Sequence, residues 1–161
     1  MTFLAAEHYL PHEAPMVMLE NVLGVGKDSA CCEVKVSADG LLAPFLDQHG
    51  QLPVWFAIEL MAQTVGVWNG WHAQQEGGEP QLGMLLGGRG MRCSIAAFPA
   101  GSLLVIHVSQ LLKDDKLACF ECTIASRDSQ TQVDTQLVQA RLNTYQPEAE
   151  EAKRLLQGTA T

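Results

Sequence analysis

One carboxylic acid stands out because it lies in the most apolar stretch of the chain. Residues 54–71 are mostly apolar and contain a single charged side chain, Glu59. An ionised carboxylate in a dry interior costs several kcal/mol unless it is paired, whereas a carboxyl group at the wall of an apolar cavity keeps its proton and serves as a general acid. The alternative is a solvated first helical turn, in which Glu59 only complements the helix dipole.

Two histidines are the candidate partners of this acid. His49 lies ten residues before Glu59, in the segment that leads into the apolar stretch. Imidazole is the side chain best suited to proton transfer near neutral pH, so His49 is a candidate base, or else a solvated residue beside Asp47. His12 lies between two prolines and is either a catalytic histidine or a hydrogen-bond donor that fixes its loop. The predicted catalytic residues are Glu59, His49 and His12.

Two further patterns favour structure over chemistry. Cys119 and Cys122 have metal-ligand spacing, but residues three apart in a strand point to opposite faces, and no second pair accompanies them. The Gly-Gly-Arg-Gly run at 87–90 interrupts a strand-like segment and opens no helix, so it predicts a bulge or bend and not a phosphate loop. We therefore expect neither a metal site nor a cofactor-binding site.

Composition predicts one ordered domain over residues 1–161. Hydrophobic residues make up 47% of the 161 residues, and the net charge is −8. An acidic protein is poorly suited to bind nucleic acid or anionic membranes, and no stretch is long and apolar enough for a membrane span. Five cysteines, an odd number, without a secretion signal indicate reduced thiols and a cytoplasmic location.

The elements that must position Glu59 follow from periodicity and turn residues. Pro53 suits the start of a helix over 54–71 and Gly70 suits its end, while Gly66 within it predicts close backbone packing. The helix is apolar on every face and must be wrapped. The predicted strands cover 16–25, 30–36, 82–95, 103–112, 117–126 and 132–145.

This element order predicts an α+β protein with the hotdog fold. A curved antiparallel sheet of about six strands would wrap a long buried central helix. The lead-in is 1–16, the core is 17–145, and 146–161 is a peripheral tail. Residues 39–53 are predicted to be a loop with little regular structure, because they contain two glycines and two prolines.

Three motifs carry a resemblance to a known family. Leu-Pro-His-Glu-Ala-Pro-Met at 10–16, Glu-Leu-Met-Ala-Gln at 59–63 and Phe-Pro-Ala-Gly at 98–101 occur in the order and spacing of the FabA/FabZ-type 3-hydroxyacyl-carrier-protein dehydratases. The likeness covers about residues 9–145 and is strongest to the ApeP-like branch, which serves aryl-polyene synthesis.

The resemblance implies a function, partners and a set of site residues. The reaction would convert a 3-hydroxyacyl thioester to the 2-enoyl thioester, in fatty-acid-like or aryl-polyene chain extension. An acyl carrier protein would present the substrate on its phosphopantetheine, without any cofactor. The chain would form a homodimer, or a heterodimer with a second, ApeI-like hotdog subunit. The residues implied to contact substrate are Pro53, Trp55, Phe56 and Gln63.

The chain departs from the resembled family where the catalytic histidine is expected. That histidine would lie fourteen residues before the acid, and Phe45 occupies the place here. His49, or a histidine of a partner subunit, would then supply the base. Two other functions stay open: an acyl-thioester hydrolase, in which Glu59 activates water, and a non-catalytic subunit of a heterodimeric dehydratase.

Overall fold

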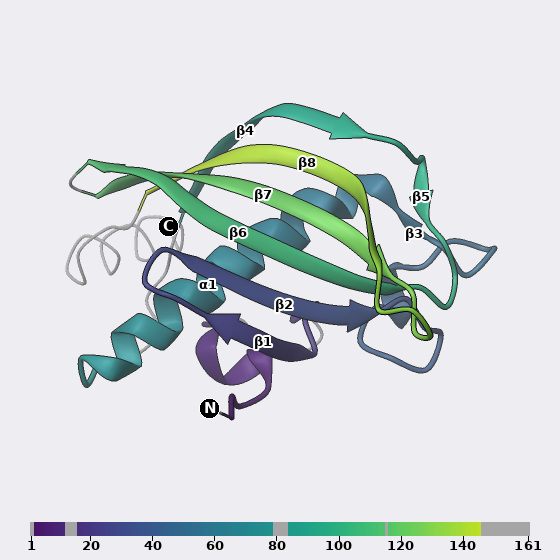
Figure 1. The fold of residues 1–161 in the computed structure, drawn as a ribbon, viewed down its shortest axis with the longest axis horizontal. Coiled ribbons are helices and arrows are strands. Elements are labelled where there is room, and N and C mark those ends of the chain that lie inside the picture. The colour runs from purple at the N-terminus through teal and green to yellow at the C-terminus, as the bar shows by residue number, and fades with distance from the viewer. Residues whose placement is uncertain (1, 12–15, 79–83, 115, 146–161) are drawn as a thin grey trace, which may run out of the picture.

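A six-stranded antiparallel sheet forms the body of the molecule, with the strand order β1-β2-β6-β7-β8-β4 (Figure 1). The structure is a computed structural model and describes residues 2–11, 16–78, 84–114 and 116–145. The predicted peripheral tail lies outside the described residues. The strands are β1 (Asn21–Val25), β2 (Ser29–Lys35), β4 (Met84–Cys93), β6 (Leu103–Asp114), β7 (Leu117–Arg127) and β8 (Asp134–Tyr145).

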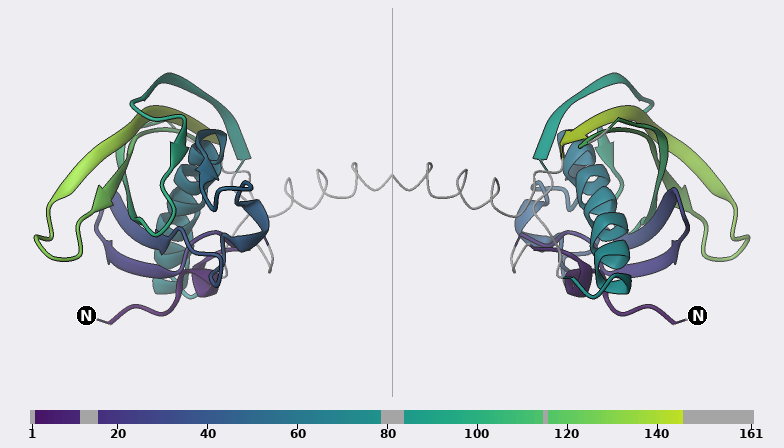
Figure 2. Two further views of the ribbon diagram at one scale, coloured as in Figure 1. Left: turned by 90° about the vertical axis from the view of Figure 1, so that its right-hand side faces the viewer. Right: turned by 90° about the vertical axis from the view of Figure 1, so that its left-hand side faces the viewer.

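The sheet curves around one long helix, α1 (Ala57–Gln75), which follows the 3-10 turn η3 (Val54–Phe56) (Figure 2). Side chains alternate along the strands, and those on the concave face, such as Leu104 and Ile106, are buried with Leu60 and Met61 of the helix. The predicted hotdog architecture is confirmed. Among the described residues, no helix combines the length and apolarity needed to cross a bilayer.

The helix is longer than the sequence indicated, and the prediction that it ends near Gly70 is wrong. Gly70 lies inside α1, where a Cβ atom would overlap the carbonyl oxygen of Tyr9 in the 3-10 turn η1 (Ala6–Tyr9). At Gly66, a Cβ would lie 2.8 Å from the Cδ2 atom of Leu10. Both glycines therefore let the N-terminal segment approach the helix backbone, and the close packing predicted for Gly66 is confirmed.

The first strand is shorter than predicted, because residues 16–20 do not join the sheet as a strand. The Met18 N–H donates to the side-chain oxygen of Gln63, 2.8 Å away, and the Met16 carbonyl accepts from the Gln63 side-chain amide at 2.7 Å. The helix side chain thus occupies backbone groups that a strand partner would otherwise use.

The segment 39–53 contains structure that was not predicted. It includes a 3-10 turn, η2 (Ala43–Phe45), and a two-residue strand, β3 (Leu52–Pro53), which pairs with β5 (Ala97–Phe98). Two residues are too few to show a period, so the prediction of an irregular loop was wrong at these positions. The small β3–β5 sheet anchors the start of the helix, since the Val54 N–H donates to the Ala96 carbonyl at 3.1 Å.

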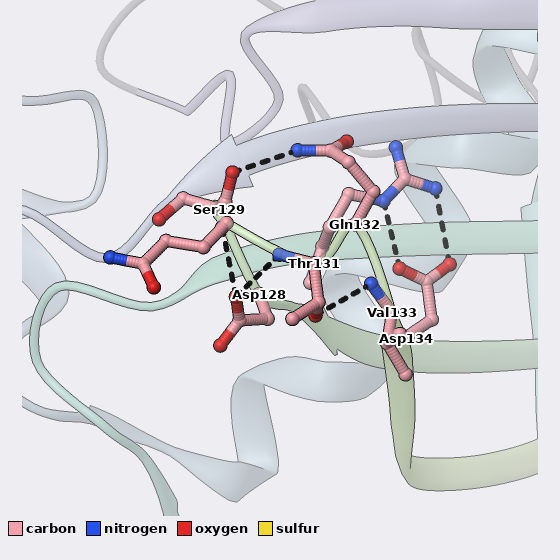
Figure 3. Close-up of polar contacts among 8 residues, drawn as sticks. Asp128, Ser129, Thr131, Gln132, Val133 and Asp134 are labelled. Atoms are coloured by element: carbon pink, nitrogen blue, oxygen red, sulfur yellow. Dashed lines mark hydrogen bonds and ion pairs between the residues drawn. The ribbon is translucent and has the colours of Figure 1, made fainter.

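The turn between β7 and β8 is closed by a short polar network (Figure 3). One carboxylate oxygen of Asp128 accepts hydrogen bonds from the backbone N–H groups of Gln130 and Thr131, at 2.8 and 2.9 Å. These bonds favour the charged form and lower the pKa of Asp128. At the base of the turn, Arg127 forms a two-bond ion pair with Asp134, at 2.8 and 3.1 Å. The turn thereby fixes the register of the two long strands.

Candidate active site

Glu59 lies in the first turn of α1 and is half-buried. Its neighbours at helical spacing are Trp55 and Ala62, and Ile58 precedes it directly in the sequence. Trp55 is 71% exposed, and the other two are partly buried. The acid therefore lies beside apolar residues that are open to solvent at Trp55 and pack against the core at Ile58 and Ala62.

Gln63 holds the Glu59 carboxylate in place. It is 1% exposed, and its Nε2 group donates to the Oε1 atom of Glu59 at 2.9 Å. The second Nε2 hydrogen goes to the Met16 carbonyl, and the Oε1 atom accepts from the Met18 N–H. Both donor hydrogens are therefore used within the protein, which favours a positioning role over the substrate contact predicted for this residue.

Three aromatic side chains, Phe45, Trp55 and Phe56, form a cluster next to the start of α1. The Phe45 and Phe56 rings are 5.3 Å apart, and the Trp55 and Phe56 rings are 6.1 Å apart. Phe45 occupies the place where the resemblance would put a histidine, and here it packs against Phe56 as an apolar residue. Pro53 is buried immediately before this group, so three of the predicted substrate-contacting residues, Pro53, Trp55 and Phe56, adjoin the turn that carries Glu59.

The structure does not bring His49 into contact with the acid. His49 lies in an exposed turn, where the Asp47 carboxylate accepts from the backbone N–H groups of His49 and Gln51 at 2.8 and 2.9 Å. Its ring is 3.4 Å from the side-chain nitrogen of Gln48. Within the described part of the chain, no hydrogen bond joins an imidazole to Glu59.

His12 lies outside the described residues. The described chain resumes at Met16, whose carbonyl shares the Gln63 amide with Glu59. The second candidate histidine therefore precedes, by four residues in the sequence, a backbone group fixed beside the candidate acid.

Sequence reasoning missed two residues of this face, Ile58 and Ala62. The position of Ala62, three residues after Glu59, was a usable signal, because such spacing shares one side of a helix, whereas the position of Ile58, one residue before the acid, was not. Ile58 lies against strand β4, since a Cβ atom built on Gly88 of β4 would be 3.4 Å from the Cδ1 atom of Ile58. The start of α1 is therefore adjacent to β4, the strand at one edge of the sheet.

Two hollows on the described surface of the chain lie away from the acid. One of about 430 Å³ is lined by Arg89, Arg92 and Arg141, among others. Another, of about 640 Å³, lies between the turn that follows β5 and the β7–β8 turn, and Glu59 lines neither of them.

The buried thiols offer no competing nucleophile. Burial raises the pKa of Cys32 and the pKa of Cys122 to about 12, so both are neutral thiols at physiological pH. In the described residues, no group of three or more His, Cys, Asp or Glu side chains is arranged to hold a metal ion.

Comparison with solved structures finds a strong match and others that share only the fold. The strong match is the dehydratase heterocomplex ApeI:P from Xenorhabdus doucetiae, with 50% identity and a TM-score of 0.86 over 96% of this chain and 98% of that chain. A hypothetical thioesterase from Streptococcus pneumoniae TIGR4, solved with coenzyme A, is 12% identical, with a TM-score of 0.58 over 79% of this chain and 84% of that chain.

The PaaI protein of the Escherichia coli phenylacetic acid degradation operon is 11% identical, with a TM-score of 0.58 over 79% of this chain and 78% of that chain. At such low identity, this protein and the thioesterase show the fold alone. No curated protein is significantly similar to the sequence. The family model described as ApeP dehydratase matches residues 4–157, which is most of the sequence. With this match and the 50% identity to the solved heterocomplex, the chain belongs to the ApeP-like dehydratase family.

Proposed function

We propose that the protein removes water from a 3-hydroxyacyl thioester held on an acyl carrier protein and yields the 2-enoyl thioester. Membership of a dehydratase family supports the reaction type, and the proposal adds the substrate and its carrier. The carrier's phosphopantetheine would present the chain, and the protein would need no cofactor of its own. Five free cysteines fit the cytoplasm, where such carriers work.

The observation that carries the proposal is the setting of Glu59. Its half-buried carboxylate lies beside apolar residues, and one oxygen is fixed by Gln63. A carboxyl group held in one orientation beside apolar walls suits proton donation to a leaving hydroxyl. The aromatic wall of Phe45, Trp55 and Phe56 suits an acyl or aryl chain.

The proposed dehydration needs two groups, an imidazole as the base and Glu59 as the acid. An imidazole takes the proton from C2 of the thioester, the C3–O bond breaks, and Glu59 gives its proton to the departing hydroxyl so that water leaves. The C2 electron pair forms the new double bond. The 3-10 turn η3 leads directly into α1, and the positive end of the helix dipole there would stabilise the negative charge that develops on the thioester carbonyl.

A second hotdog chain completes the site in this proposal. The solved relative is a heterocomplex of two dehydratase chains, and the exposed Trp55 beside Glu59 marks the face that such a chain would cover. The base is His49, His12 or a histidine of the partner subunit. Covering the exposed Trp55 ring would also add a further apolar wall beside Glu59.

A non-catalytic role is the second candidate, and one observation favours it. No described imidazole forms a hydrogen bond with Glu59, so the described part of the chain displays no acid–base pair. In this alternative it would stabilise an active partner and contribute no reacting group.

The experiment is a single substitution in the co-expressed complex with the hotdog partner. We expect Glu59→Gln to lower kcat for enoyl formation about a hundredfold or more, the contribution typical of a general acid. Glu76→Gln, at the other end of the same helix, is the matched control and should leave the rate unchanged. The readouts are enoyl absorbance and free thiol.

The possible outcomes distinguish a dehydratase, a hydrolase and a structural subunit. Loss of enoyl formation without thiol release supports the dehydratase. Thiol release by the wild-type complex would instead identify a hydrolase. An unchanged rate in the Glu59→Gln complex would leave the chain with a structural role.

A further inference from the structure

The strand β4 is a long open edge of the sheet. Its ten residues pair with β8 on one side only, and no described strand pairs with its other side. The opposite edge is less open, because β1 has five residues and Ala5 forms an isolated bridge with Asn21. Unpaired N–H and C=O groups along β4 are a template for another strand.

A bulge in β4 places two arginines on one face. Arg89 is opposite Arg141 of β8 and Arg92 is opposite Gln139, so three steps along β4 match two along β8. Without the extra residue, side chains three apart would point to opposite faces. Gly90 within the bulge has a φ of 63°, in the left-handed region that glycine adopts at no steric cost. This explains Gly90 of the glycine-rich run.

The face that carries these arginines is the outer one. Residues 140 and 142 of β8 are buried against the core, so Gln139 and Arg141, which alternate with them, point outward. Arg89, Arg92 and Arg141 line one hollow of about 430 Å³ together with Glu121. They are three of only ten Lys and Arg residues in a chain of net charge −8.

The cationic charge of this cluster is only partly neutralised by described residues. Glu121 is paired with Arg141 at 3.6 Å, and its other oxygen accepts from Gln139 at 2.6 Å. Within the described part of the chain, neither Arg89 nor Arg92 has a carboxylate partner, and β4 contains no acidic residue. Arg89 and Arg141 are directly opposite each other across the strand pair, where like charges are destabilising.

Self-pairing through this edge would double the charge. Two copies of β4 related by a twofold axis perpendicular to the sheet would keep their outer faces on the same side. Six guanidinium groups would then gather along one joint, with only two Glu121 carboxylates among them. We infer that the Arg89 and Arg92 pair opposes self-pairing and selects a different chain, whose edge strand carries carboxylates on its outer face.

This inference rests on the proposed hotdog partner. It adds that the partner pairs with the edge strand β4 and that the charges of Arg89 and Arg92 determine which chain can pair there. A bulge that aligns like charges on an open edge is a repulsive element against the wrong partner as well as an attraction for the right one. Because β4 adjoins Ile58 beside Glu59, the same choice would determine which chain completes the site.

The test uses this chain with itself and needs neither partner nor substrate, so it is independent of dehydratase activity. Sedimentation is measured for wild type, for the Arg89→Glu/Arg92→Glu variant, and for their equimolar mixture, at low and high salt. We expect the mixture to associate about tenfold more tightly than wild type alone at low salt. The difference should shrink at high salt, where the Debye length is shorter.

Two controls keep the result specific. Lys35→Glu/Lys113→Glu changes the net charge equally on other strands, and its mixture with wild type should show no such gain. Arg89→Gln/Arg92→Gln should self-associate more tightly than wild type. The inference is overturned if wild type pairs with itself as tightly as the mixture does, if the control mixture gains equally, or if the mixture stays monomeric.

Discussion

Gln63 uses both N–H hydrogens and its carbonyl oxygen inside the protein, and this sets the position of the candidate acid. One hydrogen goes to Glu59 and the other to the Met16 carbonyl. The Met18 N–H completes the set. A residue with no free donor is poorly suited to bind substrate, but it holds a carboxylate at a fixed angle to whatever lies in the slot.

The positioning role predicts a specific kinetic pattern. Gln63→Met keeps the side-chain length but removes the hydrogen bond to Glu59, so we expect kcat of the complex to fall about tenfold to a hundredfold with little change in KM. The variant also leaves the buried Met18 N–H without a partner, which should cost about 1–3 kcal/mol of stability. Rates normalised to the folded fraction separate the two effects. A rise in KM at constant kcat would instead indicate that Gln63 binds substrate.

At the scale of elements, two glycines explain how η1 packs on α1. A Cβ at Gly70 would overlap the Tyr9 carbonyl, which is backbone and cannot move away easily. A Cβ at Gly66 would meet only the end of the Leu10 side chain, which can adjust. The two positions therefore differ in tolerance although both lie within the same helix.

This difference is measurable by thermal or urea unfolding. We expect Gly70→Ala to destabilise the protein by about 1–3 kcal/mol or more, as overpacking does. Gly66→Ala should be close to neutral, because the gain of about 1 kcal/mol in helix propensity offsets the adjustment of Leu10. Equal losses in both variants would show that η1 does not pack as described.

The element order could be predicted from the sequence because it depends on periodicity, and the limits of several elements could not because they depend on contacts. The helix continues past Gly70 to Gln75 and holds the β1–β2 turn: Trp68 donates to the Lys27 carbonyl at 3.2 Å, and the His72 ring lies 2.9 Å from the Gly26 carbonyl. No local pattern encodes these long-range bonds. A bulge in the Gly-Gly-Arg-Gly run was predictable, and it lies between Arg89 and Arg92, where the positive φ of Gly90 favours glycine.

The candidate site was predictable in part for the same reason. Glu59 stands out in any apolar helix, and the spacing of Trp55 to it places both on one face. The role of Gln63 required the position of the lead-in segment, which comes from residues 45 or more positions away. The base is still unassigned, because its position depends on chain packing or on a second subunit.

At the scale of the whole molecule, two features that a second chain could cover lie close together. The sheet leaves one side of α1 uncovered by strands (Figure 2), and the edge strand β4 adjoins the start of that helix through Ile58 and Gly88. A chain that pairs with β4 would approach Glu59 and the exposed Trp55. Assembly and completion of the site would then be one event.

A substitution at Trp55 tests whether binding of the partner and completion of the site are coupled. It is 71% exposed, and a large aromatic residue buried in an interface typically contributes about 2 kcal/mol or more to binding. We expect Trp55→Ser to weaken binding of the hotdog partner by about thirtyfold, the equivalent of that energy, while the unfolding temperature of the isolated chain stays constant. Leu23→Ser, at an exposed leucine on the opposite edge strand β1, is the control and should bind normally. If Trp55→Ser binds the partner as wild type does but raises KM, Trp55 lines the substrate channel and the partner covers a different face.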